Sequence, residues 1–138
     1  MSRDACFTWP IRVYYEDTDA GGVVYHAQYL KFLERARTEW LRAAGIEQDR
    51  LLEEHGVVFA VTRADVRYRR AARFNEALTV TVVPEKTGRA RLAFTQTIVR
   101  TDRPDEPLIT AEVEVACVEV PRFRARPIPE FLVETLKL

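Results

Sequence analysis

An acidic run near the N-terminus holds the densest set of side chains that could do chemistry. Glu16, Asp17 and Asp19 fall within four residues, directly before Gly21 and Gly22. Such crowding makes it costly to ionise all three carboxylates. A helix that begins just after the glycines would place free N–H groups beside these carboxylates. A carboxylate base or nucleophile next to amide donors that stabilise an oxyanion suits attack on a carbonyl carbon.

Two other interpretations of this run are a turn cap and a calcium loop. Asp17 or Asp19 could cap a turn, and the pattern alone does not separate this role from a chemical one. For calcium, both aspartates match the first two ligand positions of the loop. Gly21 then stands at the third position and Gln28 where a late glutamate is required, so calcium is disfavoured.

His26 follows the glycines at the expected start of a long helix. It could be structural, or it could orient Asp19 and help to bind a substrate while its backbone N–H faces the reacting carbonyl. Tyr25 and Gly22 stand in the same turn, and we assign them to positioning of the oxyanion and the substrate. The candidate catalytic residues are therefore Asp19 and His26.

Other nucleophiles and metal ligands are poorly represented. The only serine is Ser2, and neither Cys6 nor Cys117 has a candidate base beside it, which argues against a Ser or Cys triad. The two cysteines also lack the spacing of a metal site. We therefore expect no metal and no cofactor.

Composition narrows the class of protein. The 138 residues suit one domain, residues 1–138, and 21 basic residues balance 21 acidic ones. Zero net charge argues against a globally basic nucleic-acid binder. No apolar run approaches the roughly 20 residues that span a bilayer, and residues 1–11 lack the apolar core of a signal peptide. We expect a cytoplasmic protein.

Local basic clusters could still hold an anionic ligand. Lys86, Arg89 and Arg91 flank a turn at Gly88, where exposed cations can bind phosphates. The largest cluster is a solvated sheet face, a subunit contact or a binding surface, and its members are Arg63, Arg67, Arg69, Arg70 and Arg73. Arg122, Arg124 and Arg126 form a third group just before the expected last helix.

Hydrophobic periodicity predicts one long helix among strands. Apolar residues recur every three or four positions over 25–44, and a short helix follows over 48–54. The period then changes to two, which predicts antiparallel strands. The expected strands are 7–15, 57–70, 77–85, 89–101 and 108–120, with a closing helix over 129–136. This order predicts an α+β fold in which a sheet of about five strands wraps around the long helix.

The run from Tyr15 to Tyr29 resembles the signature of the 4-hydroxybenzoyl-CoA thioesterase-like hotdog proteins, and most closely that of the Tol-Pal-associated acyl-CoA thioesterases. The segments 34–39 and 94–96 fit the same subgroup. The resemblance implies a hotdog fold, a dimer with one continuous sheet and often a tetramer. It also implies that Asp19 is the catalytic aspartate and that the amide of His26 polarises the thioester carbonyl. Arg89 and Arg91 match the basic hairpin that meets the coenzyme A phosphates.

We therefore predict an acyl-CoA thioesterase that releases a free acid and CoA. Asp19 either activates water or attacks the thioester, and the sequence leaves both open. The predicted partners are the acyl-CoA substrate, an acyl carrier protein as a further candidate, and copies of the chain in a homodimer or homotetramer. One alternative is a hotdog hydratase or dehydratase that uses Asp19 and His26 as an acid/base pair. Another is a non-catalytic module that binds acyl-CoA or acyl carrier protein.

Overall fold

The computed structural model describes residues 6–138, so Ser2 lies outside the described residues. One sheet contains the strands β1 (Phe7–Arg12), β2 (Val57–Tyr68), β3 (Ala77–Gly88), β4 (Arg91–Arg100), β5 (Arg103–Glu119) and β6 (Arg124–Ala125). The helical segments are the 3₁₀ helix η2 (Tyr15–Asp17), α1 (Gln28–Ala43), α2 (Gln48–His55) and α3 (Glu130–Leu136). Within residues 6–138, no helix is long and apolar enough to cross a membrane.

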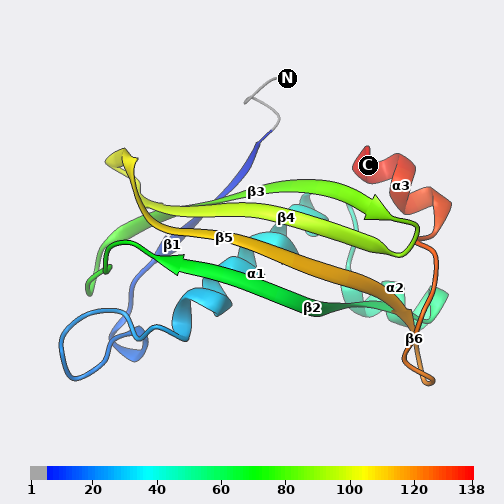
Figure 1. The fold of residues 1–138 in the computed structure, drawn as a ribbon, viewed down its shortest axis with the longest axis horizontal. Helices are drawn as coiled ribbons and strands as arrows, with labels where there is room; N and C mark the ends of the chain where they lie inside the picture. Colours follow the sequence, from blue (N-terminus) through cyan, green and yellow to red (C-terminus); the bar gives the residue numbers. More distant parts are fainter. Residues whose placement is uncertain (1–5) are drawn as a thin grey trace.

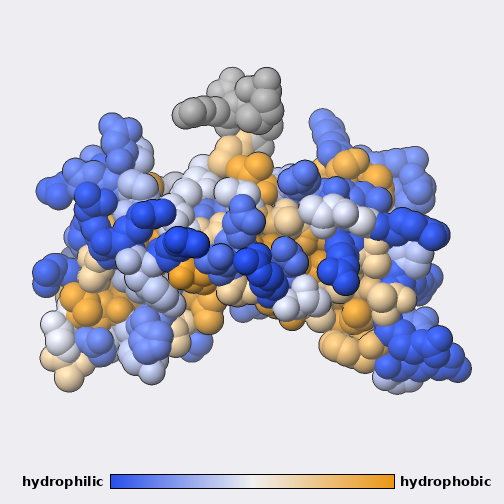
Figure 2. Space-filling model, viewed as in Figure 1, coloured by the Kyte–Doolittle hydropathy of each residue, from blue (hydrophilic) through white to orange (hydrophobic). Residues whose placement is uncertain are grey.

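The strands pair in the order β1-β3-β4-β5-β2, every pair is antiparallel, and the short β6 adds to β5. The helix α1 crosses one face of this curved sheet (Figure 1). The opposite face, turned toward the viewer, carries mainly hydrophilic side chains (Figure 2). The predicted α+β fold, an antiparallel sheet around one long helix, is confirmed.

The core lies between α1 and the sheet. In β4 the buried side chains alternate with exposed ones, as the period of two predicts: Leu92, Phe94 and Ile98 point inward. Phe32 and Leu33 of α1 are fully buried against this face. Because their burial removes large apolar areas from water, the hydrophobic effect fixes α1 on the sheet.

The start of α1 differs from the prediction. The helix begins at Gln28 rather than near Tyr25, because residues 25–27 form a turn instead. The Tyr25 N–H donates to the Asp17 carbonyl at 2.8 Å, and the Gln28 N–H donates to the Tyr25 carbonyl at 2.8 Å. The candidate residue His26 therefore lies two positions before the helix, in a turn that the acidic run helps to shape.

The strand β2 forms an edge of the sheet and pairs only with β5 among the described residues. Unpaired N–H and C=O groups along such an edge can pair with another chain. Two of its side chains are large, apolar and exposed: Val61 at 54% and Tyr68 at 51%. This edge lies beside α1 and ends next to the turn that carries His26, since the Tyr68 hydroxyl donates to the His26 carbonyl.

Candidate active site

The two aspartates of the acidic run have different surroundings. Asp17 is buried, with 2% of its surface exposed. Its carboxylate accepts hydrogen bonds from the Tyr14 N–H at 2.8 Å and from the Gln28 side-chain amide at 2.9 Å. These bonds join η2 to the first turn of α1. Asp17 therefore has a structural role, and the turn-cap interpretation applies to this aspartate.

Asp19 is exposed and stands in a tight turn. Its Oδ1 accepts from the Gly21 N–H at 2.8 Å, and its own N–H donates to the Val23 carbonyl at 2.9 Å. Within residues 6–138, Oδ2 has no hydrogen-bond partner. Gly22 closes the turn with φ +82°, a left-handed conformation that favours glycine, and donates to the Asp19 carbonyl at 3.0 Å. The turn holds the carboxylate in place and leaves one oxygen free.

The backbone N–H of His26 is also free among the described residues. It lies just before α1, where the helix dipole favours negative charge. The amide of Tyr25 is occupied by Asp17, so only the side chain of Tyr25 remains for a substrate. That ring lies 4.5 Å from the His26 ring, centroid to centroid, and is half exposed.

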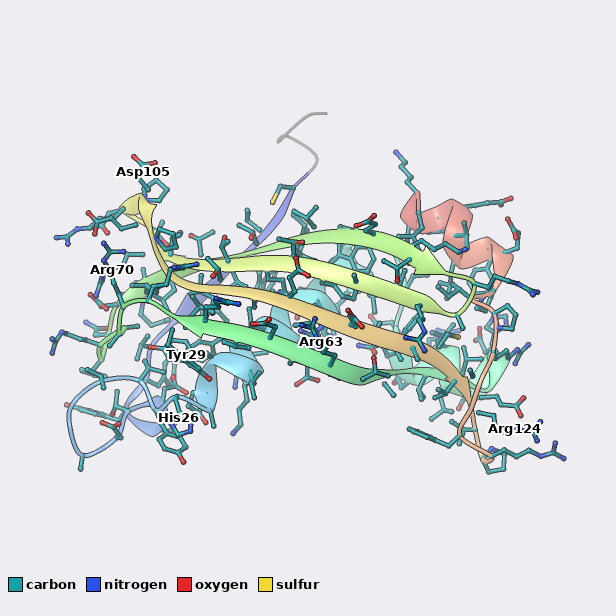
Figure 3. All side chains as sticks on the ribbon, viewed as in Figure 1. His26, Tyr29, Arg63, Arg70, Asp105 and Arg124 are labelled. Carbon is teal, nitrogen blue, oxygen red and sulfur yellow. The ribbon has the colours of Figure 1, made fainter. Side chains whose placement is uncertain are left out.

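Asp19 and His26 face a common depression of about 360 Å³. Its other lining residues are Val23, Val24, Tyr29, Tyr68, Arg69, Arg70 and Ala71. The Tyr29 hydroxyl accepts from the Ala72 N–H at 3.0 Å, and burial raises the pKa of this phenol, so it stays protonated. Figure 3 shows His26, Tyr29 and Arg70 at one end of the molecule. A free carboxylate oxygen and a free amide at one depression can serve attack on a carbonyl.

The chain does not bring the predicted phosphate-binding residues to this depression. Lys86, Arg89 and Arg91 lie at the β3–β4 turn, at the opposite end of the sheet (Figure 1). The strand β3 has 12 residues, and at about 3.3 Å per residue it separates the two ends by roughly 35–40 Å. In one chain these cations are therefore remote from Asp19.

Comparison with known proteins identifies the superfamily of this chain. The family model described as thioesterase-like superfamily matches residues 13–136. The chain belongs to this superfamily. It is 44% identical to the acyl-CoA thioester hydrolase YbgC of Escherichia coli O157:H7 over 131 residues, which cover 95% of this chain and 96% of that protein.

Solved structures of this superfamily have the same fold. A probable thioesterase from Bartonella henselae has a TM-score of 0.83 and 34% identity, covering 91% of this chain and 100% of that chain. The 1,4-dihydroxy-2-naphthoyl-CoA thioesterase Slr0204 from Synechocystis has a TM-score of 0.89 and covers 96% of each chain. At 21% identity Slr0204 supports the fold alone. The predictions of a hotdog fold and of a thioester hydrolase are confirmed.

Two arginines of this thioesterase-like site were not among the predicted site residues. Arg69 and Arg70 follow β2 directly and line the depression beside Asp19. Their N–H groups donate to the Leu108 carbonyl at 2.8 and 3.2 Å, which holds this segment against β5. The signal in the sequence was the cluster over 63–73, but periodicity could not show that its end turns toward the acidic run.

A chamber of about 340 Å³ lies next to the depression, between α1 and the inner face of the sheet. Its lining is mostly apolar and includes Leu30, Trp40, Phe59, Val61, Phe94 and Val113. Ligand pockets are typically apolar cavities of about 300–1,000 Å³. Leu30 lines the chamber and the preceding residue, Tyr29, lines the depression, so the two hollows adjoin along α1.

The site offers no arrangement for a metal ion. Among residues 6–138, no three His, Cys, Asp or Glu side chains lie close enough together to hold one. Cys117 is buried, and burial raises the pKa of its thiol.

Proposed function

We propose that this protein hydrolyses acyl-CoA thioesters to a free carboxylic acid and CoA. One observation carries the proposal: Asp19 and His26 line the same depression before α1, and within residues 6–138 the Asp19 Oδ2 and the His26 N–H have no hydrogen-bond partner. The 44% identity to a YbgC acyl-CoA thioester hydrolase over nearly the whole chain supports the substrate class. We also propose that the chain falls in the Tol-Pal-associated subgroup, on the strength of the segments 15–29 and 34–39.

In one form of the mechanism, Asp19 is a general base. Its free oxygen takes a proton from water, and the oxygen of that water bonds to the thioester carbon. The negative charge that develops on the carbonyl oxygen is stabilised by the His26 N–H and the positive end of α1. The tetrahedral intermediate then breaks its C–S bond, and the leaving CoA thiolate takes the proton back from Asp19.

In the other form, Asp19 is the nucleophile. Its carboxylate oxygen bonds to the thioester carbon, CoA leaves as the thiolate, and a mixed anhydride remains. Water then hydrolyses the anhydride. A single turnover in ¹⁸O-labelled water tests for the nucleophilic form. When water attacks the Asp19 carbon of the anhydride, the label stays in the protein and the product acid carries the unlabelled aspartate oxygen, whereas a general base never places the label in Asp19.

We propose that a second copy of the chain supplies the phosphate-binding cations. Antiparallel pairing of two β2 edges would bring the end of one copy that carries Arg89 and Arg91 toward the end of the other that carries Asp19. The free β2 edge and its exposed apolar side chains support a homodimer, since closed symmetric assembly is the usual way to cover such a surface. Two such dimers would form the predicted homotetramer.

The hydrolysis proposal is tested by thiol release from a panel of acyl-CoA thioesters with the purified protein. Asp19→Asn should abolish most of the release, which also separates hydrolysis from a non-catalytic binding role. Acyl groups that carry an α,β double bond or a β-hydroxyl group test the hydratase alternative, because addition or loss of water leaves the thioester bond intact. Acyl carrier protein thioesters belong in the same panel. The cytoplasmic location stays a prediction.

A further inference from the structure

Tyr29, the second residue of α1, carries a hydroxyl group that neither form of the mechanism uses. Its side chain is buried, with 2% of its surface exposed, yet it lines the depression together with Asp19 and His26. Figure 3 shows Tyr29 and His26 at the same end of the molecule. Buried tyrosine hydroxyls usually have hydrogen-bond partners, so the partners of this one indicate its role.

The hydroxyl oxygen of Tyr29 has a partner, whereas its proton has none within the described chain. The oxygen accepts a hydrogen bond from the Ala72 N–H at 3.0 Å. Among residues 6–138, the hydroxyl proton has no acceptor. Leaving a buried donor without an acceptor costs free energy, so a ligand that places an acceptor atom in the depression would relieve this cost.

The packing around Tyr29 fixes the position of the hydroxyl. The ring lies edge-to-face against the rings of Phe32 and Tyr68, with centroid distances of 6.0 and 5.8 Å. The Ala72 carbonyl accepts from the Val24 N–H at 2.8 Å, so the residue that bonds the hydroxyl also holds the segment after the acidic run. A donor that is fixed before the substrate arrives needs little reorganisation during the reaction, which is the condition for strong electrostatic stabilisation.

Burial keeps this hydroxyl protonated. It raises the pKa of Tyr29 above the ordinary 10.0, against the opposing effects of the Ala72 hydrogen bond and the Arg100 charge. The phenol is therefore a donor at neutral and mildly alkaline pH. Because its oxygen already accepts a bond, the O–H group is polarised and donates more strongly. The other ionisable side chains near the hydroxyl or in the depression are those of Glu76, Tyr68, Asp19, His26, Arg69 and Arg70.

The place of Tyr29 in α1 relates its hydroxyl to the amide of His26. Side chains on a helix lean toward its N-terminus and cover the turn three or four residues earlier. For Tyr29 that turn contains His26, three residues before it, whose N–H has no partner among the described residues. Both residues line one depression. Backbone N–H groups and tyrosine hydroxyls are donors of the kind that stabilise an oxyanion.

We propose that the Tyr29 hydroxyl donates a hydrogen bond to the thioester carbonyl oxygen, as a second donor beside the His26 N–H. The bond strengthens as this oxygen gains negative charge in the tetrahedral intermediate, and no proton is transferred. Tyr29 is then a catalytic residue in either form of the mechanism, because both forms pass through an oxyanion at this carbonyl. The inference rests on the proposed hydrolysis of acyl-CoA.

Tyr29→Phe removes the hydroxyl and keeps the ring. We expect kcat to fall about 10²–10³-fold with little change in KM, because the donor acts mainly on the charged transition state. The variant also leaves the Ala72 N–H without its acceptor, so circular dichroism and urea unfolding accompany the kinetics. Tyr14→Phe, at an exposed residue outside the depression, is the matched control and should keep both constants. An unchanged kcat in Tyr29→Phe would overturn the proposal.

Fluorinated tyrosines at the same position separate donation from a structural role, and they keep the hydroxyl if Tyr29→Phe does not fold. Fluorine lowers the pKa of a phenol, so each replacement of Tyr29 in a series with more fluorine should ionise at a lower pH. A phenolate still accepts from the Ala72 N–H but has no proton to donate. The alkaline limit of kcat should therefore move to lower pH along the series, while circular dichroism shows an unchanged fold.

The same series at Tyr14 is the control and should leave the alkaline limit in place. A limit that does not follow the phenol pKa at Tyr29 would overturn the proposal, because a purely structural acceptor remains an acceptor after ionisation.

A carbonyl probe tests the contact without turnover. In acetonyl-CoA a CH₂ group stands between the carbonyl carbon and the sulfur, so the enzyme cannot hydrolyse it. With ¹³C at the carbonyl, the infrared stretch of the bound probe should lie at a lower frequency in the unaltered chain than in Tyr29→Phe, because each donated hydrogen bond weakens the C=O bond. Equal frequencies would overturn the contact. A frequency difference in a chain that releases no thiol would refute the proposed hydrolysis and keep the contact.

Discussion

The Tyr68 hydroxyl donates a hydrogen bond of 3.1 Å to the backbone carbonyl of His26, a residue 42 positions earlier in the chain. Tyr68 is the last residue of β2, and His26 precedes α1. The bond therefore ties the free edge of the sheet to the turn that carries His26, which lines the depression. The Tyr68 ring also packs edge-to-face against the buried Tyr29 ring, with centroids 5.8 Å apart. This contact holds Tyr68 against the core.

Removal of this hydroxyl tests its positioning role. Tyr68→Phe should keep the ring packing but loosen the His26 turn, so we expect kcat to fall several-fold with little change in KM. The physical reason is that the oxyanion donor acts mainly in the transition state. Tyr15→Phe, at an exposed residue stacked on Phe74, is the control and should be neutral. An unchanged kcat in Tyr68→Phe would show that the His26 turn keeps its conformation without the Tyr68 hydroxyl.

Substitution of each of the two aspartates should distinguish a catalytic role from a structural one. Asp19→Asn should preserve the fold and reduce kcat by about 10²–10⁴-fold, because an amide neither accepts the proton nor attacks the thioester. Asp17→Asn weakens buried hydrogen bonds to the Tyr14 N–H and Gln28, so it should lower the free energy of unfolding by about 1–3 kcal/mol. Its effect on kcat should be much smaller. Steady-state kinetics and denaturant unfolding measure both, and equal losses of activity would contradict the choice of Asp19.

The β3–β4 turn provides a test of phosphate binding. Arg89→Ala combined with Arg91→Ala should raise KM for acyl-CoA and leave kcat nearly unchanged, because contacts to the phosphates are the same in ground and transition states. The effect should shrink for a truncated thioester that lacks the nucleotide. Arg50→Ala, which removes an exposed cation of α2, is the control. An equal rise in KM for the truncated substrate would show that these arginines have a structural role and do not bind the phosphates.

The Glu76–Arg100 ion pair gives a prediction about pH. Burial by itself would raise the pKa of Glu76, but hydrogen bonds from Arg100 at 2.7 Å and from the Arg73 N–H at 2.8 Å outweigh it and hold the pKa below the ordinary 4.5. A carboxyl group whose pKa is depressed in the folded state stabilises the protein above its unfolded pKa. This contribution is lost as the pH falls through the lower folded pKa.

Glu76→Gln should therefore lower the free energy of unfolding by about 1 kcal/mol at pH 7, a figure reduced for solvent screening of the partly exposed pair. The difference from the unaltered chain should shrink as the pH falls below about 4.5 and further through the folded pKa of Glu76. Urea unfolding at pH 7 and at several lower pH values measures it. A difference that is independent of pH would mean that the charge of Glu76 has no role.

Assembly should govern activity if two chains share the site. Dilution below the dimer Kd should reduce the specific activity per chain, because the second copy supplies the phosphate-binding cations. Activity assays over a dilution series, with sedimentation at matching concentrations, follow both quantities. A fully active monomer at assay concentration would refute the shared site.

The amino-acid sequence by itself determined the fold class and supplied the candidate catalytic residues. Apolar spacing of three and four marked α1, and alternation marked the long strands, because each pattern matches the period of one backbone geometry. The motif around Asp19 indicated a hotdog thioesterase, and the family model and a relative confirmed the thioesterase-like superfamily. Element ends were less accurate: β1 stops at Arg12 and α1 starts at Gln28, since hydrogen bonds to Glu76 and Asp17 shape the segment between them.

Only the tertiary structure decided which residues meet. It buried Asp17 and exposed Asp19, although both stand in one acidic run and no periodicity distinguishes them. It brought Tyr68, Arg69 and Arg70 to the depression and left Arg89 and Arg91 at the far end of the sheet. The physical reason is that local patterns specify the period and the face of an element, whereas long-range antiparallel pairing specifies which ends of two elements lie together.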